Sequence, residues 1–371
     1  MRKGIASDSL GVWHILRYTM VSEFIVLHSA REIAMTLPAT FKKVVIRQTG
    51  RNPHTCLAVI DDAPLKTPSA HDVLIRNHYA GVNSMDIGRM LGVDGWQQAL
   101  PIDFGIETIG EVVAIGKEVT NLAVGDVVMT ALPGNGFREY THVAHNLTMK
   151  MPAIDPRYIS TLISGSLGKI AIEFLGEVRA DDVVVITSGL GSSGNFALQL
   201  AINTGSHVIT TCNNAEEAKI LQQWQPNRII NRVEEDIATV LAEEYPDAVT
   251  LIFDKMGGRI LDACIKQTAP RARVILADAL TEHLRGEDIT HRLDFYHQVI
   301  RNSLTITGIN LSDYANAIKV ETLKLLDLME QGLVEALIDK RSFVGIEQVP
   351  DAIAYLMSGE ARGKVVVKFV K

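Results

Sequence analysis

The sequence predicts a mixed α/β fold in two parts, an all-β part followed by a doubly wound parallel sheet. Short β-like runs separated by turn residues fill residues 41–155. From Pro156 onward, strand-like and helix-like segments alternate, which indicates a parallel sheet with helices on both faces. At the start of this alternation, Val183–Thr187 runs directly into three glycines spaced G-x-G-x-x-G.

The β-like runs of the first part are bounded by turn signals such as Asn52-Pro53 and Asn135-Gly136. The predicted strands are Lys43–Arg47, Asp72–Ala80, Gly110–Ile115 and Asp126–Ala131.

In the second part the first four of six predicted strands each precede a predicted helix. The strands are Val183–Thr187, His207–Thr211, Arg228–Ile230, Ala248–Asp254, Arg273–Leu276 and Leu304–Thr307. The helices are Ser193–Thr204, Ala215–Trp224, Glu234–Glu244 and Gly258–Thr268. Residues 281–297 contain three histidines and predict a polar connection rather than a metal site. The tail predicts a helix from Tyr314 to Gln331, a second near Val349–Met357 and a strand Lys364–Val370.

Composition limits the possible partners. The 371 residues carry a net charge of −7, which gives no electrostatic reason to expect nucleic acid or an anionic membrane. No apolar run approaches the roughly 20 residues that span a bilayer. The three cysteines form no C-x-x-C pair, and a reducing, cytoplasmic setting fits them best. Residues 1–34 read as an extension outside the fold, because Met35 resembles a second start.

The glycine spacing predicts a dinucleotide-binding loop, because it follows a buried strand and opens a helix. Gly189 permits the tight turn, Gly191 lets backbone amides approach a pyrophosphate, and Gly194 allows close helix–strand packing. Ser192 and Ser193 then lie where the helix begins and presents the positive end of its dipole. The alternative is a glycine turn that holds no ligand.

The second strand of the alternation indicates which nucleotide binds. NAD sites usually carry Asp or Glu at its end, about 20 residues after the glycines. Here Asn213 and Asn214 follow the strand, so an adenosine 2′-phosphate would meet no carboxylate there. Lys219 and Arg232 are nearby basic candidates for binding that phosphate, although either could be an ordinary solvated charge. The sequence therefore favours NADPH.

Five motifs give the chain a family resemblance. They are Gly81-Val82-Asn83, Gly105-x-Glu107-x-x-Gly110, Val124–Val128, Gly136-Phe137-x-Glu139-Tyr140 and the closing Gly363–Val367. With the glycine loop, they make residues 35–371 resemble the medium-chain dehydrogenase/reductase superfamily, and within it the zinc-independent quinone oxidoreductases and prostaglandin reductases. The resemblance implies a GroES-like β-rich catalytic domain from residues 35–155 and 311–371, with a Rossmann domain, residues 156–310, inserted between them. It also implies a homodimer.

The resemblance allows a test for zinc. Alcohol dehydrogenases of this superfamily hold catalytic zinc with Cys and His at marked positions, where this chain has Asn83 and Ile106. An amide and an isoleucine do not replace a thiolate and an imidazole as zinc ligands. We therefore expect no metal.

Without zinc, the resemblance implies hydride transfer from NADPH to the C=C bond of an α,β-unsaturated carbonyl, or to a quinone. A hydrogen-bond donor must stabilise the charge that develops on the substrate oxygen. Asn83 is the first candidate, although it could be a structural amide. Relatives place phenols near positions where this chain has Arg89 and Lys169, which could supply charge or a proton or could point into solvent. The resemblance further places nicotinamide near Asn83, Ser166, the loop from Ala277 to Leu280 and the backbone around Ile309, Asn310 and Leu311.

Three functions remain open from the sequence. The first is an enone reductase, the second is a quinone reductase, and the third is an NADPH-binding sensor or structural protein with little catalysis. The third remains because the phenols expected of relatives are missing.

Overall fold

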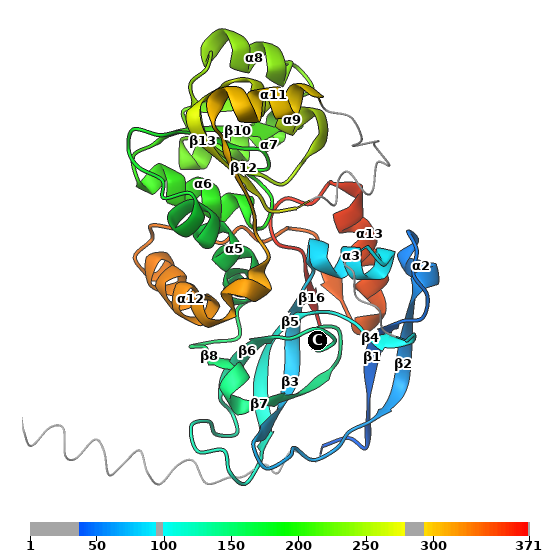
Figure 1. Ribbon diagram of the computed structural model, residues 1–371. Coiled ribbons are helices and arrows are strands. Elements are labelled where there is room, and N and C mark those ends of the chain that lie inside the picture. Colours follow the sequence, from blue (N-terminus) through cyan, green and yellow to red (C-terminus); the bar gives the residue numbers. More distant parts are fainter. Residues whose placement is uncertain (1–36, 94–98, 279–292, 370–371) are drawn as a thin grey trace, which may run out of the picture. The chain divides into compact units, whose positions relative to one another are not determined.

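Six parallel strands form one sheet, in the spatial order β11-β10-β9-β12-β13-β14. Figure 1 labels β10, β12 and β13 of this sheet. This computed structural model describes residues 37–93, 99–278 and 293–369. The six strands are β9 (Val183–Ile186), β10 (His207–Cys212), β11 (Arg228–Asn231), β12 (Val249–Asp254), β13 (Thr268–Leu276) and β14 (Thr305–Gly308). The direction of the strand order reverses between β9 and β12, and ligands of such sheets bind beyond the carboxyl ends of the strands at this point.

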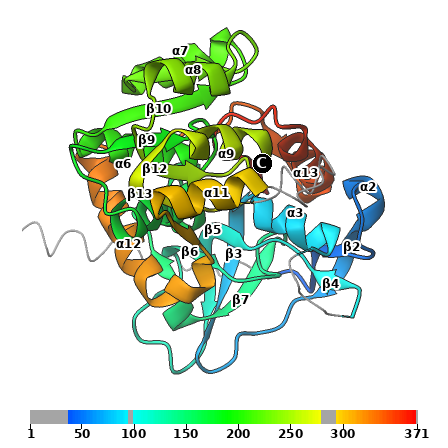
Figure 2. The ribbon, with the colours of Figure 1, turned by 45° about the horizontal axis from the view of Figure 1, so that its top comes forward.

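Helices cover both faces of this sheet (Figure 2). They are α6 (Gly194–Asn203), α7 (Ala215–Leu221), α8 (Ile237–Glu244), α9 (Gly258–Lys266) and α11 (Leu293–Asn302). Val184 and Ile186 of β9 pack into one hydrophobic cluster, and Val185 between them packs into the other. This alternation explains why β9 is apolar throughout, since both of its faces are buried.

The β-rich part contains a mainly antiparallel sheet in the order β15-β16-β3-β5-β6-β8, with β7 on β3, and a smaller sheet β2-β1-β4. The strands are β1 (Thr40–Ile46), β2 (Leu57–Pro64), β3 (Asp72–Gly81), β4 (Ile102–Asp103), β5 (Glu107–Ile115), β6 (Val127–Ala131), β7 (Tyr140–Ala144), β8 (Met149–Lys150), β15 (Phe343–Val344) and β16 (Val366–Lys368). Because β16 pairs with β3, the C-terminal segment returns to a sheet that begins near residue 72.

Six further helices surround these sheets: α2 (Pro53–Cys56), α3 (Ser84–Leu91), α4 (Pro156–Ser160), α5 (Ser166–Lys169), α12 (Ala315–Glu330) and α13 (Val349–Ser358). Two π-helical turns, Thr161–Gly165 and Ile170–Leu175, flank α5. α3 ends at Gly92, whose left-handed φ of 77° suits glycine. Figure 1 shows α13 beside α2 and α3, and Ile353 shares a hydrophobic cluster with Ile87 and Cys56.

The predicted fold class, a GroES-like sheet domain with a Rossmann-like parallel sheet, is confirmed. α2 and α3 lie in the region that the sequence predicts as an all-β module with few helices, and neither helix was assigned there. β13 begins at Thr268 rather than at Arg273. His297 belongs to α11, so the predicted polar connection ends earlier than expected, and residues 281–292 lie outside the described residues. The predicted extension, residues 1–34, also lies outside them.

Among the described residues, no helix combines the length and the apolar composition needed to cross a bilayer.

Candidate functional site

The glycine loop joins β9 to α6 with little space for side chains. A Cβ added at Gly194 would lie 1.7 Å from the Ser188 carbonyl oxygen, and one at Gly189 would lie 2.3 Å from Thr210 Oγ1. A Cβ at Gly191 would lie 2.8 Å from Ser188 Oγ and 3.3 Å from the Ser188 carbonyl oxygen. Glycine at 189 and 194 therefore allows the tight packing of the turn, while glycine at 191 leaves the loop backbone accessible from the cavity.

The larger of two cavities at this loop has a volume of about 1110 Å³. Ser188, Leu190, Gly191 and Ser192 line it beside the N-terminus of α6. Free backbone amides and the helix dipole at such a terminus favour an anionic group. The loop therefore fits the pyrophosphate of a dinucleotide.

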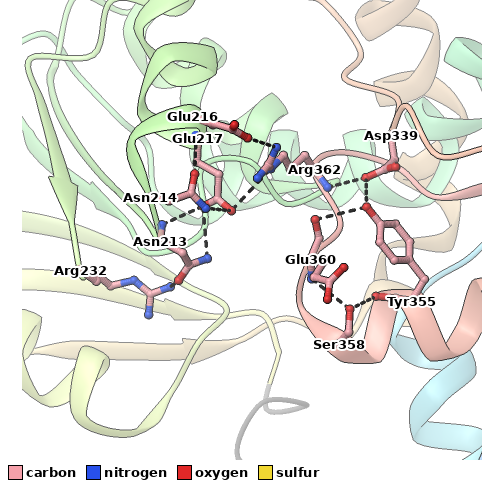
Figure 3. Close-up of polar contacts among 10 residues, drawn as sticks. All are labelled: Asn213, Asn214, Glu216, Glu217, Arg232, Asp339, Tyr355, Ser358, Glu360 and Arg362. Carbon is pink, nitrogen blue, oxygen red and sulfur yellow. Dashed lines mark hydrogen bonds and ion pairs between the residues drawn. The ribbon is translucent and has the colours of Figure 1, made fainter. Parts of the chain in front are cut away.

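Polar side chains line the same cavity beyond β10 (Figure 3). Arg232 Nη2 donates to Asn213 Oδ1 at 2.5 Å, and the Asn213 backbone N–H donates to Glu217 Oε2 at 2.7 Å. From the C-terminal segment, Arg362 reaches Glu216 at 3.2 Å and Glu217 at 3.7 Å. Arg232 therefore lies beside Asn213, but the expectation of no carboxylate at the end of this strand is wrong, because Glu217 folds back onto Asn213 from α7.

The smaller cavity, of about 310 Å³, adjoins the larger one. Both cavities are lined by Ser84, Ser192, Lys255 and Asp278. The smaller one is also lined by Asn83, Met85, Gly88, Val93, Ile163, Ser164, Leu167, Ser193, Ala277, Ile309, Asn310 and Leu311. The carboxyl ends of β12, β13 and β14 supply several of these residues, as expected at the reversal of strand order.

A buried ammonium group lies behind the smaller cavity. Lys364 Nζ donates to Asn83 Oδ1 at 2.6 Å and to Ser164 Oγ at 3.3 Å, and it forms an ion pair with Glu107 Oε1. Asn83 Nδ2 in turn donates to Glu107 Oε1 at 3.0 Å. The Lys364 and Glu107 side chains are fully buried, so the pair is shielded from water and fixes the orientation of the Asn83 amide.

A carboxyl group supports the same corner. The Asn83 backbone N–H donates to Asp86 Oδ2 at 2.9 Å at the start of α3. Burial raises the pKa of Asp86 from 3.8 to about 7, although the Asn83 backbone hydrogen bond and the charge of Lys364 act in the opposite direction. Asp86 therefore exchanges its proton near neutral pH.

These residues do not fit zinc. Asn83 presents its oxygen to an ammonium group, and Ile106 offers no donor atom. Within residues 37–93, 99–278 and 293–369, no cluster of three His, Cys, Asp or Glu side chains could hold a metal ion.

Most predicted cofactor residues line one of the two cavities. Gly191, Asn213 and Arg232 line the larger, Ser193, Ala277, Ile309 and Asn310 line the smaller, and Ser192 lines both. Gly189 and Gly194 shape the loop behind them.

Four other predicted residues do not belong to the lining of either cavity. Lys169 is buried against Glu173 and lies 3.8 Å from Glu321, so it joins α5 to α12. The Ser166 hydroxyl bonds with Thr322 Oγ1 at 2.9 Å. Arg89 is buried in α3, and Lys219 is exposed on α7.

Sequence reasoning assigned no role to Lys364, Glu107, Ser164 or Lys255, and it included Asp278 only as part of the loop 277–280 that was expected near the nicotinamide. Lys364 and Glu107 belong to two of the family motifs. A lysine directly before a run of apolar strand residues was the one sequence feature that could have indicated a buried charge. Lys255 and Asp278 carry the only charged side chains among the described residues that line the smaller cavity. Their atoms Nζ and Oδ2 lie 3.6 Å apart. Lys255 directly follows β12, and Asp278 is the second residue after β13. These positions indicate a binding site only once the order of the strands in the sheet is known.

Two family models match the chain. The alcohol dehydrogenase GroES-like domain matches residues 69–153, and the zinc-binding dehydrogenase model matches residues 226–367. Prostaglandin reductase-3 of Mus musculus is 30% identical over 341 residues, which cover 90% of each chain. A probable quinone oxidoreductase of Leishmania amazonensis is 28% identical over 90% of this chain and 99% of its own length.

Solved structures share the fold. Escherichia coli quinone oxidoreductase, complexed with NADPH, has a TM-score of 0.76 and 19% identity, over 88% of this chain and all of that one. CurA of Vibrio vulnificus, also in complex with NADPH, has a TM-score of 0.76 and 20% identity, over 89% of this chain and 99% of that one.

Proposed function

The chain belongs to the medium-chain dehydrogenase/reductase superfamily, in the branch of the prostaglandin reductases and quinone oxidoreductases, and from this premise we propose that it is an NADPH-dependent, zinc-independent reductase of α,β-unsaturated carbonyls. The observation that carries the proposal is the fixed amide of Asn83 in the wall of the smaller cavity, which adjoins the larger one. An amide N–H in that wall can stabilise charge on a substrate oxygen.

NADPH is the proposed cofactor, and it supplies the hydride. Gly191, Ser192 and Ser193 would hold the pyrophosphate, on a turn that Gly189 and Gly194 keep tight. The similar structures from E. coli and V. vulnificus are complexes with NADPH, which supports this cofactor. Arg232 would pair with the 2′-phosphate beside Asn213.

The smaller cavity would receive the nicotinamide and the substrate. Ala277, Ile309 and Asn310 follow β13 and β14 and would border the nicotinamide. Ile163, Leu167 and other apolar side chains in the wall reduce access of water to the reacting atoms. Asn83 would donate a hydrogen bond to the carbonyl oxygen.

Quinone reduction is the second candidate, because a relative of 28% identity is named a probable quinone oxidoreductase. A quinone also presents a C=C bond conjugated to a carbonyl, so Asn83 could serve either substrate. The observable difference is the product, because one-electron reduction of a quinone releases a radical.

The test is NADPH oxidation by the purified protein over a panel of enones, enoyl thioesters and quinones, with product analysis and radical detection. We expect saturated carbonyl products and no radical. Radical products from quinones, with enones unreduced, would select the second candidate. Tight NADPH binding without any turnover would select the sensor or structural role instead.

We also propose the division into domains stated above, residues 35–155 with 311–371 and residues 156–310. The pairing of β16 with β3 supports the return of the C-terminal part to the first domain.

A homodimer is proposed through the outer edge of β14. This strand ends the parallel sheet, and Tyr296 and Ile300 on the neighbouring α11 are 64% and 77% exposed. Unpaired strand edges and exposed apolar side chains favour association. Sedimentation analysis should give twice the chain mass, and Ile300→Glu should shift the measured mass toward that of the monomer.

The three cysteines are free and buried, which supports a cytoplasmic location.

A further inference from the structure

Lys364 bonds to more than Asn83. An ammonium group has three N–H donors and no acceptor. The three donors of Lys364 have three acceptors, which are Asn83 Oδ1, Ser164 Oγ and Glu107 Oε1. Its hydrogen-bonding capacity is therefore used within the protein, and the ammonium group itself does not reach a substrate.

This arrangement determines where the hydrogens of Asn83 and Ser164 point. Since Lys364 can only donate, Asn83 must turn its oxygen toward it, and the amide nitrogen then faces away. One amide hydrogen goes to Glu107 Oε1 at 3.0 Å. Ser164 accepts from Lys364 through its oxygen, so its hydroxyl hydrogen must point elsewhere.

Both side chains have a donor hydrogen that remains for the cavity. In the part of the chain that the structure describes, neither the second amide hydrogen of Asn83 nor the hydroxyl hydrogen of Ser164 has a recorded acceptor. Asn83 is 5% exposed and Ser164 is 4% exposed, and both line the smaller cavity. Because their oxygens bond to the same nitrogen, the two donors lie close together.

The surrounding backbone holds this geometry. A Cβ at Gly81 would lie 2.2 Å from Glu107 Oε1 and 2.6 Å from Lys364 Cε, so glycine leaves room for the ion pair. Ser164 lies on the π-helical turn Thr161–Gly165, and such turns often occur at functional sites. The network is thus packed closely around Lys364.

We propose that Ser164 is a second hydrogen-bond donor to the substrate oxygen, paired with Asn83, and that Lys364 is the positioning residue for both. The inference rests on the proposed function. In the reduction, the β carbon of the substrate accepts hydride from reduced nicotinamide, whose C4–H bond breaks. The C=C electron pair moves toward the carbonyl oxygen, and the α carbon then takes a proton from water. The two donors stabilise the negative charge on that oxygen.

The ligand class follows from this geometry. Two converging donors match an oxygen that gains charge, such as that of an enone, an enoyl thioester or a quinone. A simple alkene without a carbonyl would leave both donors without a partner, which is costly in a buried site.

The test measures the bound carbonyl directly as well as the activity. Isotope-edited infrared spectra record the C=O stretch of a saturated ketone bound together with NADP⁺. We expect the wild-type protein to lower this frequency relative to the ketone in water, and Ser164→Ala to lose part of that shift. The kcat for enone reduction should fall by about 10- to 100-fold with a smaller change in KM, because the donors act mainly in the transition state. Ser164→Thr, which keeps a hydroxyl group, should retain more of the C=O frequency shift and of kcat than Ser164→Ala.

Ser160→Ala is the matched control. Ser160 is a buried serine one turn earlier, but its hydroxyl donates to the Arg157 carbonyl oxygen at 2.6 Å. Its removal should leave the frequency and kcat unchanged. If Ser164→Ala does not fold, Ser164→Cys carries the test, and its weak S–H donor should give a reduced shift.

Lys364 needs a variant that leaves no unpaired buried charge. The double variant Lys364→Met with Glu107→Gln removes both charges together. This double variant should no longer lower the C=O stretching frequency of the bound ketone, although Asn83 and Ser164 are both still present. An unchanged frequency and kcat in Ser164→Ala, with an active wild-type protein, would overturn the proposal for Ser164. An inactive wild-type protein over the whole panel would instead refute the reductase function, while the infrared shift would still report on the donor pair.

Discussion

Lys364 Nζ and Asn83 Oδ1 form a hydrogen bond of 2.6 Å, although the two residues are 281 positions apart in the sequence. Lys364 begins the segment that returns to β3 as β16, and Asn83 lies directly before α3. The C-terminal segment therefore fixes, from behind the smaller cavity, a wall residue that the first third of the chain supplies. A protein that folds without this C-terminal segment would lack a correctly oriented Asn83.

Asn83→Ala should lower kcat for enone reduction by about 100- to 1,000-fold, the usual loss when one oxyanion donor is removed. The measurement is steady-state kinetics together with NADPH affinity by fluorescence titration. NADPH affinity should change little, because the pyrophosphate and the adenosine would bind in the larger cavity, which Asn83 does not line. A variant with full activity would show that Asn83 is only a structural amide.

Two alanine substitutions in the glycine loop should have different effects. Gly194→Ala puts a Cβ 1.7 Å from a backbone oxygen, so the loop must distort and the melting temperature should fall by several degrees. Gly191→Ala puts a Cβ 2.8 Å from the Ser188 hydroxyl, which can rotate, and 3.3 Å from the Ser188 carbonyl oxygen, a much looser backbone contact than at Gly194. This variant should keep its melting temperature but bind NADPH about tenfold more weakly, because Gly191 lines the larger cavity and an added methyl group hinders the approach of the pyrophosphate to the backbone. Equal effects of both variants on stability would contradict this distinction.

Selectivity for NADPH over NADH should depend on Arg232. Arg232→Ala should weaken NADPH binding by about 10- to 100-fold and leave NADH binding nearly unchanged, since only NADPH carries the 2′-phosphate. Lys219→Ala is the comparison, because the sequence suggested Lys219 equally but the side chain is exposed on α7. Calorimetric titration of both variants with both nucleotides checks this. A larger effect at Lys219 would assign the phosphate to α7 instead.

Asp86, in the first turn of α3, should make the free energy of unfolding depend on pH. Because burial raises the pKa of Asp86 to about 7, the folded protein keeps a proton that the unfolded chain releases above its ordinary value of 3.8. Asp86 therefore destabilises the fold progressively as pH rises from about 4 to about 7, by at most about 1.4 kcal/mol per pH unit, and adds no further change above that. Urea unfolding across this range should show a flatter profile for Asp86→Asn, which keeps an oxygen to accept the Asn83 N–H. An identical slope in both proteins would mean that Asp86 titrates normally.

Chelators should leave the activity unchanged. Extended dialysis against EDTA and metal analysis of the purified protein should show full activity without stoichiometric zinc, because Lys364 already places a cation at Asn83. Recovery of activity only on adding zinc would overturn the metal-free mechanism.

Local patterns were sufficient to predict the parallel sheet and the glycine loop. β9 is apolar because it is buried on both faces, and Gly189 and Gly194 are required by contacts within one strand–turn–helix unit. α3 escaped prediction because it is short and its capping residues, Asn83 and Gly92, read equally well as turn residues.

The site was harder to predict because its contacts are distant in sequence. Lys169 and Lys364 are both lysines in apolar surroundings, and only tertiary structure separates them. Lys169 meets Glu173 and Glu321 at a helix contact, whereas Lys364 meets Glu107 and Asn83 behind the cavity. No periodicity in the sequence carries that difference.

Gly363 is bridged to Gly191 in the glycine loop, and its N–H donates to the Leu190 carbonyl oxygen at 2.8 Å. Its φ is +99°, and a Cβ there would lie 2.4 Å from the Leu337 oxygen. Any larger residue at this position would displace the backbone on both sides at once, disturbing the nucleotide loop through Leu190 and the buried ammonium group through the next residue. The single backbone position 363 therefore couples the shape of the nucleotide loop to the Lys364 network, so a substitution there should impair both together.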